Sequence, residues 1–318
     1  MRWTIEPAAP AVPIVACLPH GGVDYPRHLA QDLIMGPDTL WSDRLTRELY
    51  DFLPELGITT ITTGFSRFVA DVNRDPHGQQ HGSFRNSVVA AHLRSGRKIY
   101  RKELTRAQIR YRIKLAHEPF HRALDAAIAS RLTQFPRILL LDLHSFGIEL
   151  PGDIIVGDRH GTTAQPEATN LVRAAFTEQT GFDVRMNQRY IGGWTVRRFT
   201  DHKAVDAVAV EVNQRCYLNF KGRRYPDPPP PGDFEETKRR LRTALEKIAA
   251  NSNIRTGGVL PGHHEARGLA LKKRVDWRCQ SKATATAPMI QVTVNSAVPS
   301  RSIVSCMCLA SAYRTPAV

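Results

Sequence analysis

The sequence predicts an α/β fold, in which short strands and longer helices alternate along the chain. Four apolar runs rich in β-branched residues have the length and composition of buried strands: 12–18, 58–63, 137–143 and 205–212. Apolar residues recur at helical spacing in four further segments: 41–56, 102–133, 166–180 and 234–250. The last of these helices is expected to close the domain.

Glycine and proline residues set the expected ends of these elements. Gly57 is expected to end the first helix, whose last turn is bent or short because it contains Pro54. Pro119 predicts a kink or a break inside the second helix, and Gly181 is expected to end the third. Loops are expected in three polar or proline-rich segments: 75–97, 151–165 and 221–233.

Length and composition are those of a globular protein with one large domain or two small ones. The chain has 318 residues, of which 42% are hydrophobic and 23% are charged. No apolar run reaches the roughly 18 residues of a transmembrane helix, and the start of the chain lacks the pattern of a secretion signal. Five cysteines show no zinc-ribbon spacing, which favours a reduced, cytoplasmic setting.

The net charge of +14 divides evenly between a long and a short part of the chain. Residues 251–318 carry nine basic and two acidic residues, and residues 1–250 carry 35 basic and 28 acidic ones, so that each part has a balance of +7. No stretch of the longer part alternates basic with aromatic residues as a nucleic-acid surface does. We expect residues 1–250 to form the domain and residues 251–318 to be a basic, disordered extension.

Two histidines follow predicted strands. The run at 137–143 leads into Asp142-Leu143-His144-Ser145, and the run at 12–18 leads into Pro19-His20-Gly21-Gly22. Ligands of α/β folds bind at the carboxyl ends of strands, where a histidine can bind a metal ion or transfer a proton. A nearby acid can fix the tautomer of such a histidine. Taken alone, either histidine could instead be a hydrogen-bonded residue of a turn.

Two arginines flank a further apolar run that is expected to be a strand. Arg67 and Arg74 lie seven positions apart, and a planar guanidinium group suits the two oxygens of a carboxylate. Either arginine could instead form a surface ion pair with Asp71 or Asp75. The segment 187–200 is a second candidate for anion binding.

That segment contains the pair Gly192-Gly193, which allows close backbone approach, and then Arg197. A candidate general base follows in the next predicted strand, where Glu211 lies near the end of an otherwise apolar run. A lone carboxylate is costly to bury there unless it is paired or functional. A raised pKa would suit Glu211 for general-base work.

Six short segments, in this order, resemble the N-formylglutamate amidohydrolase family, whose members are also called N-formylglutamate deformylases. They are PHGG (19–22), SRFVADVNR (66–74), HEPFH (117–121), LLDLHS (140–145), NQRYIGGWTVRRF (187–199) and AVEVNQRCY (209–217). The resemblance covers roughly residues 10–250. It implies a fold similar to that of zinc carboxypeptidases and aspartoacylases, a phosphorylase/hydrolase-like, three-layer α/β/α arrangement with a mixed central sheet.

The resemblance also implies a metal-dependent amide hydrolase. By it, His20 and His144 are the imidazole ligands of the metal, Glu211 is the general base, and Arg67 polarises the scissile carbonyl. The implied cofactor is Zn²⁺, although other divalent metals suit the same ligands.

The implied substrate is a small carboxylate, N-formyl-L-glutamate of histidine breakdown, cleaved to glutamate and formate. Asn73 and Arg74 would clamp a substrate carboxylate, with Arg197 and the pair Gly192-Gly193 beside them. Another N-acyl amino acid or a short peptide is an alternative substrate. A non-enzymatic protein that binds nucleic acid through its basic extension is a weaker alternative, and no oligomeric state is predicted.

The carboxylate ligand is where the chain departs from the wider group. That group uses His-x-x-Glu, but Val23 stands three residues after His20. The carboxylate must then come from Asp24, Asp38 or Asp43. We favour Asp38, because the resemblance extends over the sequence PDT-x-W that contains it.

Overall fold

The computed structural model describes residues 3–7, 9–37, 40, 43–147, 149–218 and 231–255. Most of the proline-rich loop predicted at 221–233 lies outside the described residues, and so does the predicted extension beyond residue 255. Among the helices of the described segments, none is long and apolar enough to cross a membrane.

The centre of the fold is a mixed seven-stranded sheet with the order β1-β3-β2-β6-β9-β7-β8. Its strands are β1 (Thr4–Ile5), β2 (Ile14–Leu18), β3 (Thr59–Thr62), β6 (Ile138–Phe146), β7 (Ile154–Gly157), β8 (Val184–Met186) and β9 (Val205–Asn213). The four central strands run parallel, whereas β1 pairs antiparallel with β3 and β7 antiparallel with β9. The predicted mixed α/β sheet is therefore confirmed.

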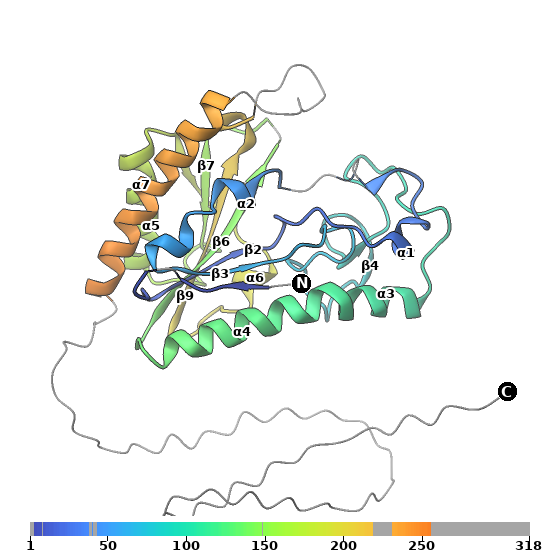
Figure 1. Cartoon of the computed structure of the whole chain (residues 1–318), viewed down its shortest axis with the longest axis horizontal. Coiled ribbons are helices and arrows are strands. Elements are labelled where there is room, and N and C mark those ends of the chain that lie inside the picture. Colours follow the sequence, from blue (N-terminus) through green and yellow to red (C-terminus); the bar gives the residue numbers. More distant parts are fainter. Residues whose placement is uncertain are drawn as a thin grey trace, which may run out of the picture. The chain divides into compact units, whose positions relative to one another are not determined.

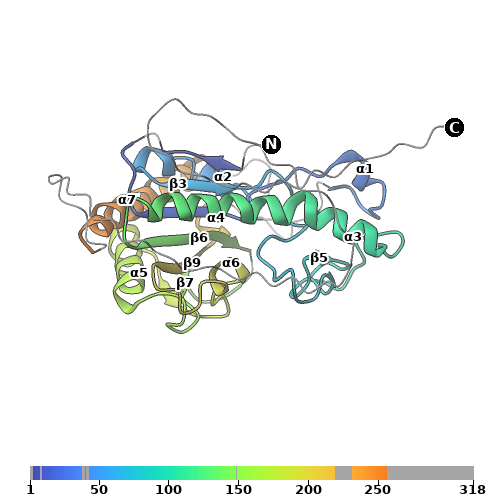
Figure 2. The ribbon, with the colours of Figure 1, turned by 90° about the horizontal axis from the view of Figure 1, so that it is seen from below.

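Helices cover both faces of the sheet, which gives the expected three layers (Figures 1 and 2). On one face, α5 (Pro166–Thr180) and α7 (Pro231–Arg255) pack on the apolar side chains of the central strands. On the other face, α4 (Glu118–Leu132) and the short α6 (Trp194–Arg197) enclose a second apolar cluster. Burial on both faces explains why the central strands are continuous apolar runs rather than alternating ones.

Strand alternation decides which polar side chains share a face. In β6, Leu139, Leu141 and Leu143 pack toward α5 and α7, whereas Ile138 and Leu140 pack toward α4. Because successive side chains point to opposite faces, Asp142 and His144 lie on the α4 face. Glu211 of β9 is in register with His144.

A smaller lobe with its own apolar cluster is built mainly from three stretches of the chain, at 29–40, 68–90 and 99–116. It contains α1 (Arg27–Ala30), the two-stranded sheet of β4 (His81–Gly82) and β5 (Val89–Ala90), and α3 (Arg106–Arg112). The polar loop predicted at 75–97 is therefore largely loop, as expected, but with a short pair of strands inside it.

The long helical region predicted at 102–133 is three helical pieces in sequence. A π-helical turn at Ile113–His117 joins α3 to α4, and Pro119 lies in the first turn of α4. Proline has no backbone N–H, so it is tolerated in a first turn and disturbs the regular bonding just before it. The break predicted at Pro119 is therefore found just before this residue, as the π-helical turn Ile113–His117.

Three predicted elements differ from the structure. The helix predicted at 41–56 is a short α2 (Thr46–Leu49) and a separate 3₁₀ turn (Leu53–Leu56), because Pro54 clashes with the carbonyl one turn earlier. The strand predicted between Arg67 and Arg74 is a series of turns, since Phe68, Val69 and Ala70 pack into the smaller lobe instead of a sheet.

The loop predicted at 151–165 contains β7, which is only four residues long and follows Gly152. The strand β8 was likewise not predicted, because its three residues leave too little pattern to detect. The helix predicted at 166–180, ended by Gly181, is confirmed as α5 with Gly181 in the left-handed conformation at its C-cap.

Candidate active site

A cavity of about 1020 Å³ lies between the ends of the central strands and the smaller lobe. From the sheet it is lined by His20 after β2, His144 in β6 and Glu211 in β9. The opposite side comes from the segments around Arg67 and Phe84. The motifs singled out in the sequence therefore meet at the carboxyl edge of the parallel strands, where α/β folds bind ligands.

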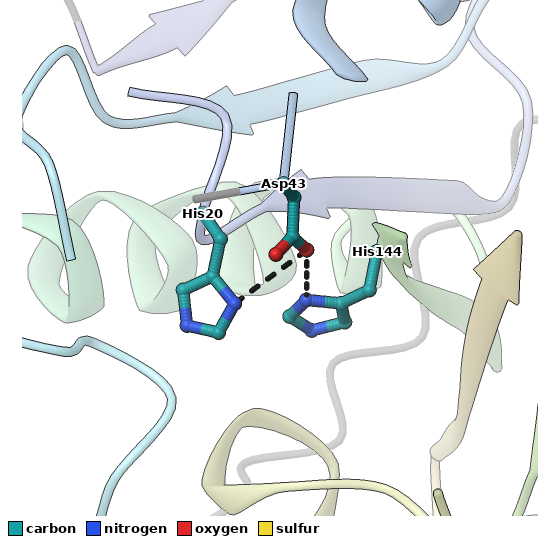
Figure 3. A group of neighbouring side chains, drawn as sticks. All are labelled: His20, Asp43 and His144. Atoms are coloured by element: carbon teal, nitrogen blue, oxygen red, sulfur yellow. Dashed lines mark hydrogen bonds and ion pairs between the residues drawn. The ribbon is translucent and has the colours of Figure 1, made fainter. Parts of the chain in front are cut away.

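Two imidazoles and one carboxylate that line this cavity lie side by side (Figure 3). His20, Asp43 and His144 are all buried, and each offers a ligand atom within 4.8 Å of the other two. Asp43 Oδ2 lies 3.0 Å from His144 Nδ1 and 3.6 Å from His20 Nδ1. Two nitrogen ligands and one oxygen ligand are a donor set that suits zinc with a position left open, so the group could hold a metal ion.

The outer nitrogen of each imidazole faces a further carboxylate. His20 Nε2 lies 2.7 Å from Asp71 Oδ1, and His144 Nε2 lies 3.1 Å from Asp142 Oδ2. A carboxylate at Nε2 favours the tautomer with its proton there, which leaves the Nδ1 lone pairs of both rings directed at the Asp43 side. Asp142, two residues before His144 in β6, is thus the nearby acid that the sequence suggested.

The carboxylates around the two histidines favour a positive charge at this position. Burial lowers the pKa of His144, but the carboxylates of Asp142 and Asp43 outweigh it and hold that pKa well above its usual value. Burial would raise the pKa of Asp71, yet the neighbouring Arg67 and Arg74 keep it well below its usual range. A metal ion can take the place of the extra proton on such an imidazole.

Asp43 is the carboxylate that the structure brings to the two histidines. Its Oδ2 also accepts a hydrogen bond of 3.1 Å from the backbone N–H of Ser145, next to His144. Asp24 is exposed and does not belong to the group. Asp38, which the sequence favoured, lies outside the described residues. The preference for Asp38 rests on a short motif, whereas Asp43 precedes α2 and lies outside any helix or strand, in a stretch where the sequence predicts a helix.

Glu211 faces the same cavity with a free carboxylate. Burial raises its pKa to about 8, an effect that His144 opposes and that Asp43 and Asp142 reinforce. Among the described residues, no hydrogen-bond partner of this carboxylate is found, in contrast to Asp43, Asp71 and Asp142. A carboxyl group with a pKa near neutrality can both accept and return a proton, as the sequence suggested for Glu211.

Arg67 and Arg74 line the cavity and share one carboxylate behind it. Arg67 Nη2 donates to Asp71 Oδ2 at 2.5 Å, and Arg74 Nη2 lies 3.6 Å from the same oxygen. The ion pair with Asp71, which the sequence left open as an alternative to substrate binding, is therefore present. It does not use up both groups, because Arg74 Nε is buried without a hydrogen-bond partner among the described residues.

Asn73 connects the histidine group to α6. Its Nδ2 lies 3.0 Å from His144 Nε2, and its Oδ1 accepts a hydrogen bond of 2.8 Å from the backbone N–H of Thr195. A Cβ at Gly193 would lie 2.4 Å from Asn73 Oδ1, so only glycine leaves room for this side chain. Both Gly192 and Gly193 line the cavity, as expected for close backbone approach.

Two further histidines, from the HEPFH motif, hold the backbone on either side of Asn73. His117 Nε2 lies 2.8 Å from the carbonyl oxygen of Arg74, and His121 Nε2 lies 2.7 Å from that of Val72. Burial, with His117 and Arg198 nearby, keeps the pKa of His121 well below its usual value, so the ring is neutral. The two histidines therefore hold the backbone around Asn73 and do not line the cavity.

Arg197 lies apart from the other predicted residues. Its guanidinium group forms an ion pair with Asp75 at 2.5 Å and lies over the Trp194 ring, and Arg197 does not line the cavity. This geometry does not support a substrate contact by Arg197. Arg189 of the same motif, which is not among the predicted site residues, lines the cavity instead.

Comparisons with known proteins identify the family of the chain. The family model described as N-formylglutamate amidohydrolase matches residues 12–218. Proteins named N-formylglutamate deformylase from Pseudomonas putida and Pseudomonas aeruginosa are 26% identical over 223 and 221 residues, which is 65% of this chain and 82% and 83% of theirs.

Solved structures show the same fold. The crystal structure of N-formylglutamate amidohydrolase from Ralstonia eutropha JMP134 superposes with a TM-score of 0.66 at 24% identity, over 80% of this chain and 98% of that one. A gene product of Agrobacterium tumefaciens superposes with a TM-score of 0.60 at 17% identity, over 80% and 96% of the two chains. Because the family model spans well over half of the 318 residues, the chain belongs to the N-formylglutamate amidohydrolase family.

Proposed function

We propose that the protein hydrolyses the formyl amide of N-formyl-L-glutamate, giving glutamate and formate, with the help of a divalent metal ion. The observation that carries the proposal is the convergence of His20, Asp43 and His144 beside the free carboxylate of Glu211. Family membership and the names of the Pseudomonas relatives support the substrate.

The residues present fit a divalent ion in both donor type and charge. Four carboxyl groups and two guanidinium groups surround the imidazoles, an excess of two negative charges when all are ionised: Asp43, Asp71, Asp142 and Glu211 with Arg67 and Arg74. His20, Asp43 and His144 would hold the ion, and two imidazoles with one carboxylate favour zinc. When bound, such an ion polarises a carbonyl oxygen and makes a water molecule more acidic.

Glu211 is the general base of the proposed reaction. Its carboxylate takes a proton from the attacking water and delivers it to the leaving nitrogen, so that the amine departs neutral. The strand β9 holds Glu211 in register with His144, which keeps the base beside the metal ligands through the reaction.

The two arginines orient the substrate. Arg67 is placed at the cavity wall to donate to the oxygen of the formyl carbonyl, where negative charge develops. Arg74, which lines the cavity as well, binds a carboxylate of the glutamate part. Asn73 donates to Asp142, the acid that faces His144, and accepts from the backbone N–H of Thr195, so it holds this acid against α6. Binding a part of the substrate that does not react then orients the bond that does.

A reduced, cytoplasmic setting remains our inference for the protein. Its support is that Cys17 and Cys216, the cysteines of the described segments, are both free thiols.

The test is formate release by the metal-loaded protein from N-formyl-L-glutamate, with N-acetyl-L-glutamate and a formylated neutral amino acid as comparisons. Glu211→Gln is expected to keep the bound metal and the fold while kcat falls roughly 10²- to 10⁴-fold. Glu48→Gln, at an exposed position of α2, is the matched control and should leave kcat unchanged. His144→Ala should lose the metal itself.

Full activity of Glu211→Gln would show that Glu211 is not the general base. Absence of formate release by the metal-loaded wild-type protein would contradict the substrate.

A further inference from the structure

The cavity is larger than the proposed substrate needs. Its volume of about 1020 Å³ is at the upper end of the roughly 300–1,000 Å³ that drug-sized ligands occupy, and N-formylglutamate is far smaller than such ligands. The proposed reaction uses only the inner end, at the histidines, Glu211, Arg67 and Arg74. The outer part has no role in the reaction described above.

Arginines dominate the outer part. Arg85, Arg94 and Arg97 come from the smaller lobe, and Arg189 comes from the segment between β8 and α6. All four are exposed, and in the described parts of the chain none of their guanidinium groups forms an ion pair. We call these four residues the outer arginines.

No described acid balances the outer arginines within the cavity. The carboxylates that line it belong to Asp43 and Glu211, which both lie at the inner end. A wall of unpaired positive charge on a concave surface concentrates anions and directs them inward. This differs from Arg67 and Arg74, whose charges are partly offset by Asp71.

Tyr190 lines the same cavity as Arg94 and Arg189, which come from segments distant in sequence. Burial and Glu211 raise the pKa of Tyr190, and the positive charges of Arg94 and Arg189 oppose this rise. Tyr190 also packs on Phe146 at the end of β6, with ring centroids 5.3 Å apart. Tyr190 and Phe146 both line the cavity.

We propose that the outer arginines bind an additional carboxylate of the substrate, so that the preferred substrate is an N-acyl glutamate extended by a further acidic group. This inference rests on the proposed function of the inner site. The reaction is the same hydrolysis, in which water splits the amide C–N bond into a carboxylate and an amine. The extension lies either on the amino-acid side, as in an acidic peptide, or on the acyl side, as in a dicarboxylic acyl group.

Pairs of substrates of equal length separate charge from size. N-formyl-Glu-Glu is compared with N-formyl-Glu-Gln for an extension on the amino-acid side, and glutaryl-glutamate with pentanoyl-glutamate for one on the acyl side. The wild-type protein is expected to prefer the acidic member of one pair in kcat/KM, through a lower KM at similar kcat. The preference should shrink as salt is added, because exposed charges are screened.

The double variant Arg94→Gln with Arg189→Gln tests whether these two residues cause the preference for the acidic substrate. Each exposed charge pair is expected to contribute roughly two- to five-fold, so the acidic preference should fall roughly ten-fold in the double variant. Lys98→Gln is the control, because it removes the same charge from an exposed position of the same lobe that does not line the cavity.

The outcomes distinguish this inference from the proposed function. If N-formylglutamate is hydrolysed and neither pair shows a preference for the acidic substrate, the inference is overturned and the proposed function stands. Should no formylated substrate react, calorimetric binding of Glu-Glu to the wild-type protein and the double variant still decides it: equal affinity overturns the inference, and binding lost only in the double variant supports it. A preference for a short oligonucleotide over Glu-Glu would also overturn it.

Discussion

His144 and Asp142 illustrate what can be inferred at the scale of single residues. They occupy alternate positions of β6, so they lie on one face, and the acid lies 3.1 Å from the ring nitrogen that faces away from Asp43. Their spacing in an apolar run was enough to predict this relation. Glu211 was predicted by the same argument, as a charged residue inside an otherwise apolar strand.

Asp43 and Asp71 could not be identified in that way. Each lies outside the helices and strands, where neither strand alternation nor helical spacing predicts the direction of a side chain. Asp71 was considered only as a partner of the arginines, yet it contacts His20 at 2.7 Å as well. Such contacts join positions far apart in sequence, and no local pattern encodes them.

The raised pKa of Glu211 predicts how pH changes the stability of the metal-free protein. Its pKa moves from 4.5 to about 8 on folding, so the folded state retains a proton that the unfolded state has lost. The stabilisation is complete below about 4.5 and is lost as pH rises through about 8. Glutamine has no carboxyl group to ionise, so Glu211→Gln avoids this loss.

We therefore expect the metal-free Glu211→Gln protein to gain stability relative to the wild type between pH 4.5 and 8, by an amount on the order of a few kcal/mol. Urea unfolding of both proteins in the presence of a chelator, at a series of pH values, measures the difference. A difference that does not change with pH would show that Glu211 is ionised in the folded protein throughout.

At the scale of elements, the predictable parts were those with enough residues to show a period. The helix at 166–180 and the strands β2, β3, β6 and β9 were expected at nearly their observed positions. Short elements such as β7 and α6 were not, because three or four residues carry too little pattern. The helix predicted at 41–56 was wrong because its apolar spacing was regular while Pro54 interrupted the backbone.

The start of α6 supplies a test of how tightly the elements fit around the site. A Cβ at Gly193 would lie 2.4 Å from Asn73 Oδ1, and Asn73 contacts His144. Gly193→Ala should therefore displace the Asn73 side chain and lower kcat/KM for N-formyl-L-glutamate by about 10²-fold, as a misplacement of about 1 Å can. The backbone itself tolerates alanine, since φ at Gly193 is −84°.

Gly78→Ala is the matched control, because the nearest atom to a Cβ there lies at 3.5 Å, an ordinary contact. Steady-state kinetics and thermal unfolding of both variants are the measurements. Equal kinetics of the two variants would show that Asn73 can move without harm to the site.

At the scale of the whole molecule, the sequence could not supply the order of the strands. The neighbours of β6 are β2 and β9, which are separated from it by more than a hundred and by about sixty residues of other structure. Pairing of such distant segments depends on packing that local sequence does not express. The resemblance to a known family supplied the three-layer architecture, and the structure confirms it.

The domain and the basic extension are expected to be independent in function. The residues that line the cavity lie between positions 20 and 214, and α7 ends at Arg255. A chain that ends after Arg255 should therefore keep the metal content and the kcat/KM of the full chain within about two-fold. Metal analysis and kinetics of the two chains measure these properties. Loss of either property in the shorter chain would show that the extension contributes to the site.

His20, Asp43 and His144 come from three segments distant in sequence and form the group that is proposed to bind one metal ion. The most direct measurement is metal affinity and stoichiometry of the wild type, Asp43→Asn, Asp24→Asn and Asp38→Asn. One ion per chain is predicted, bound at least about ten-fold more weakly by Asp43→Asn and as tightly as in the wild type by the other two. Undiminished affinity in Asp43→Asn would contradict the account.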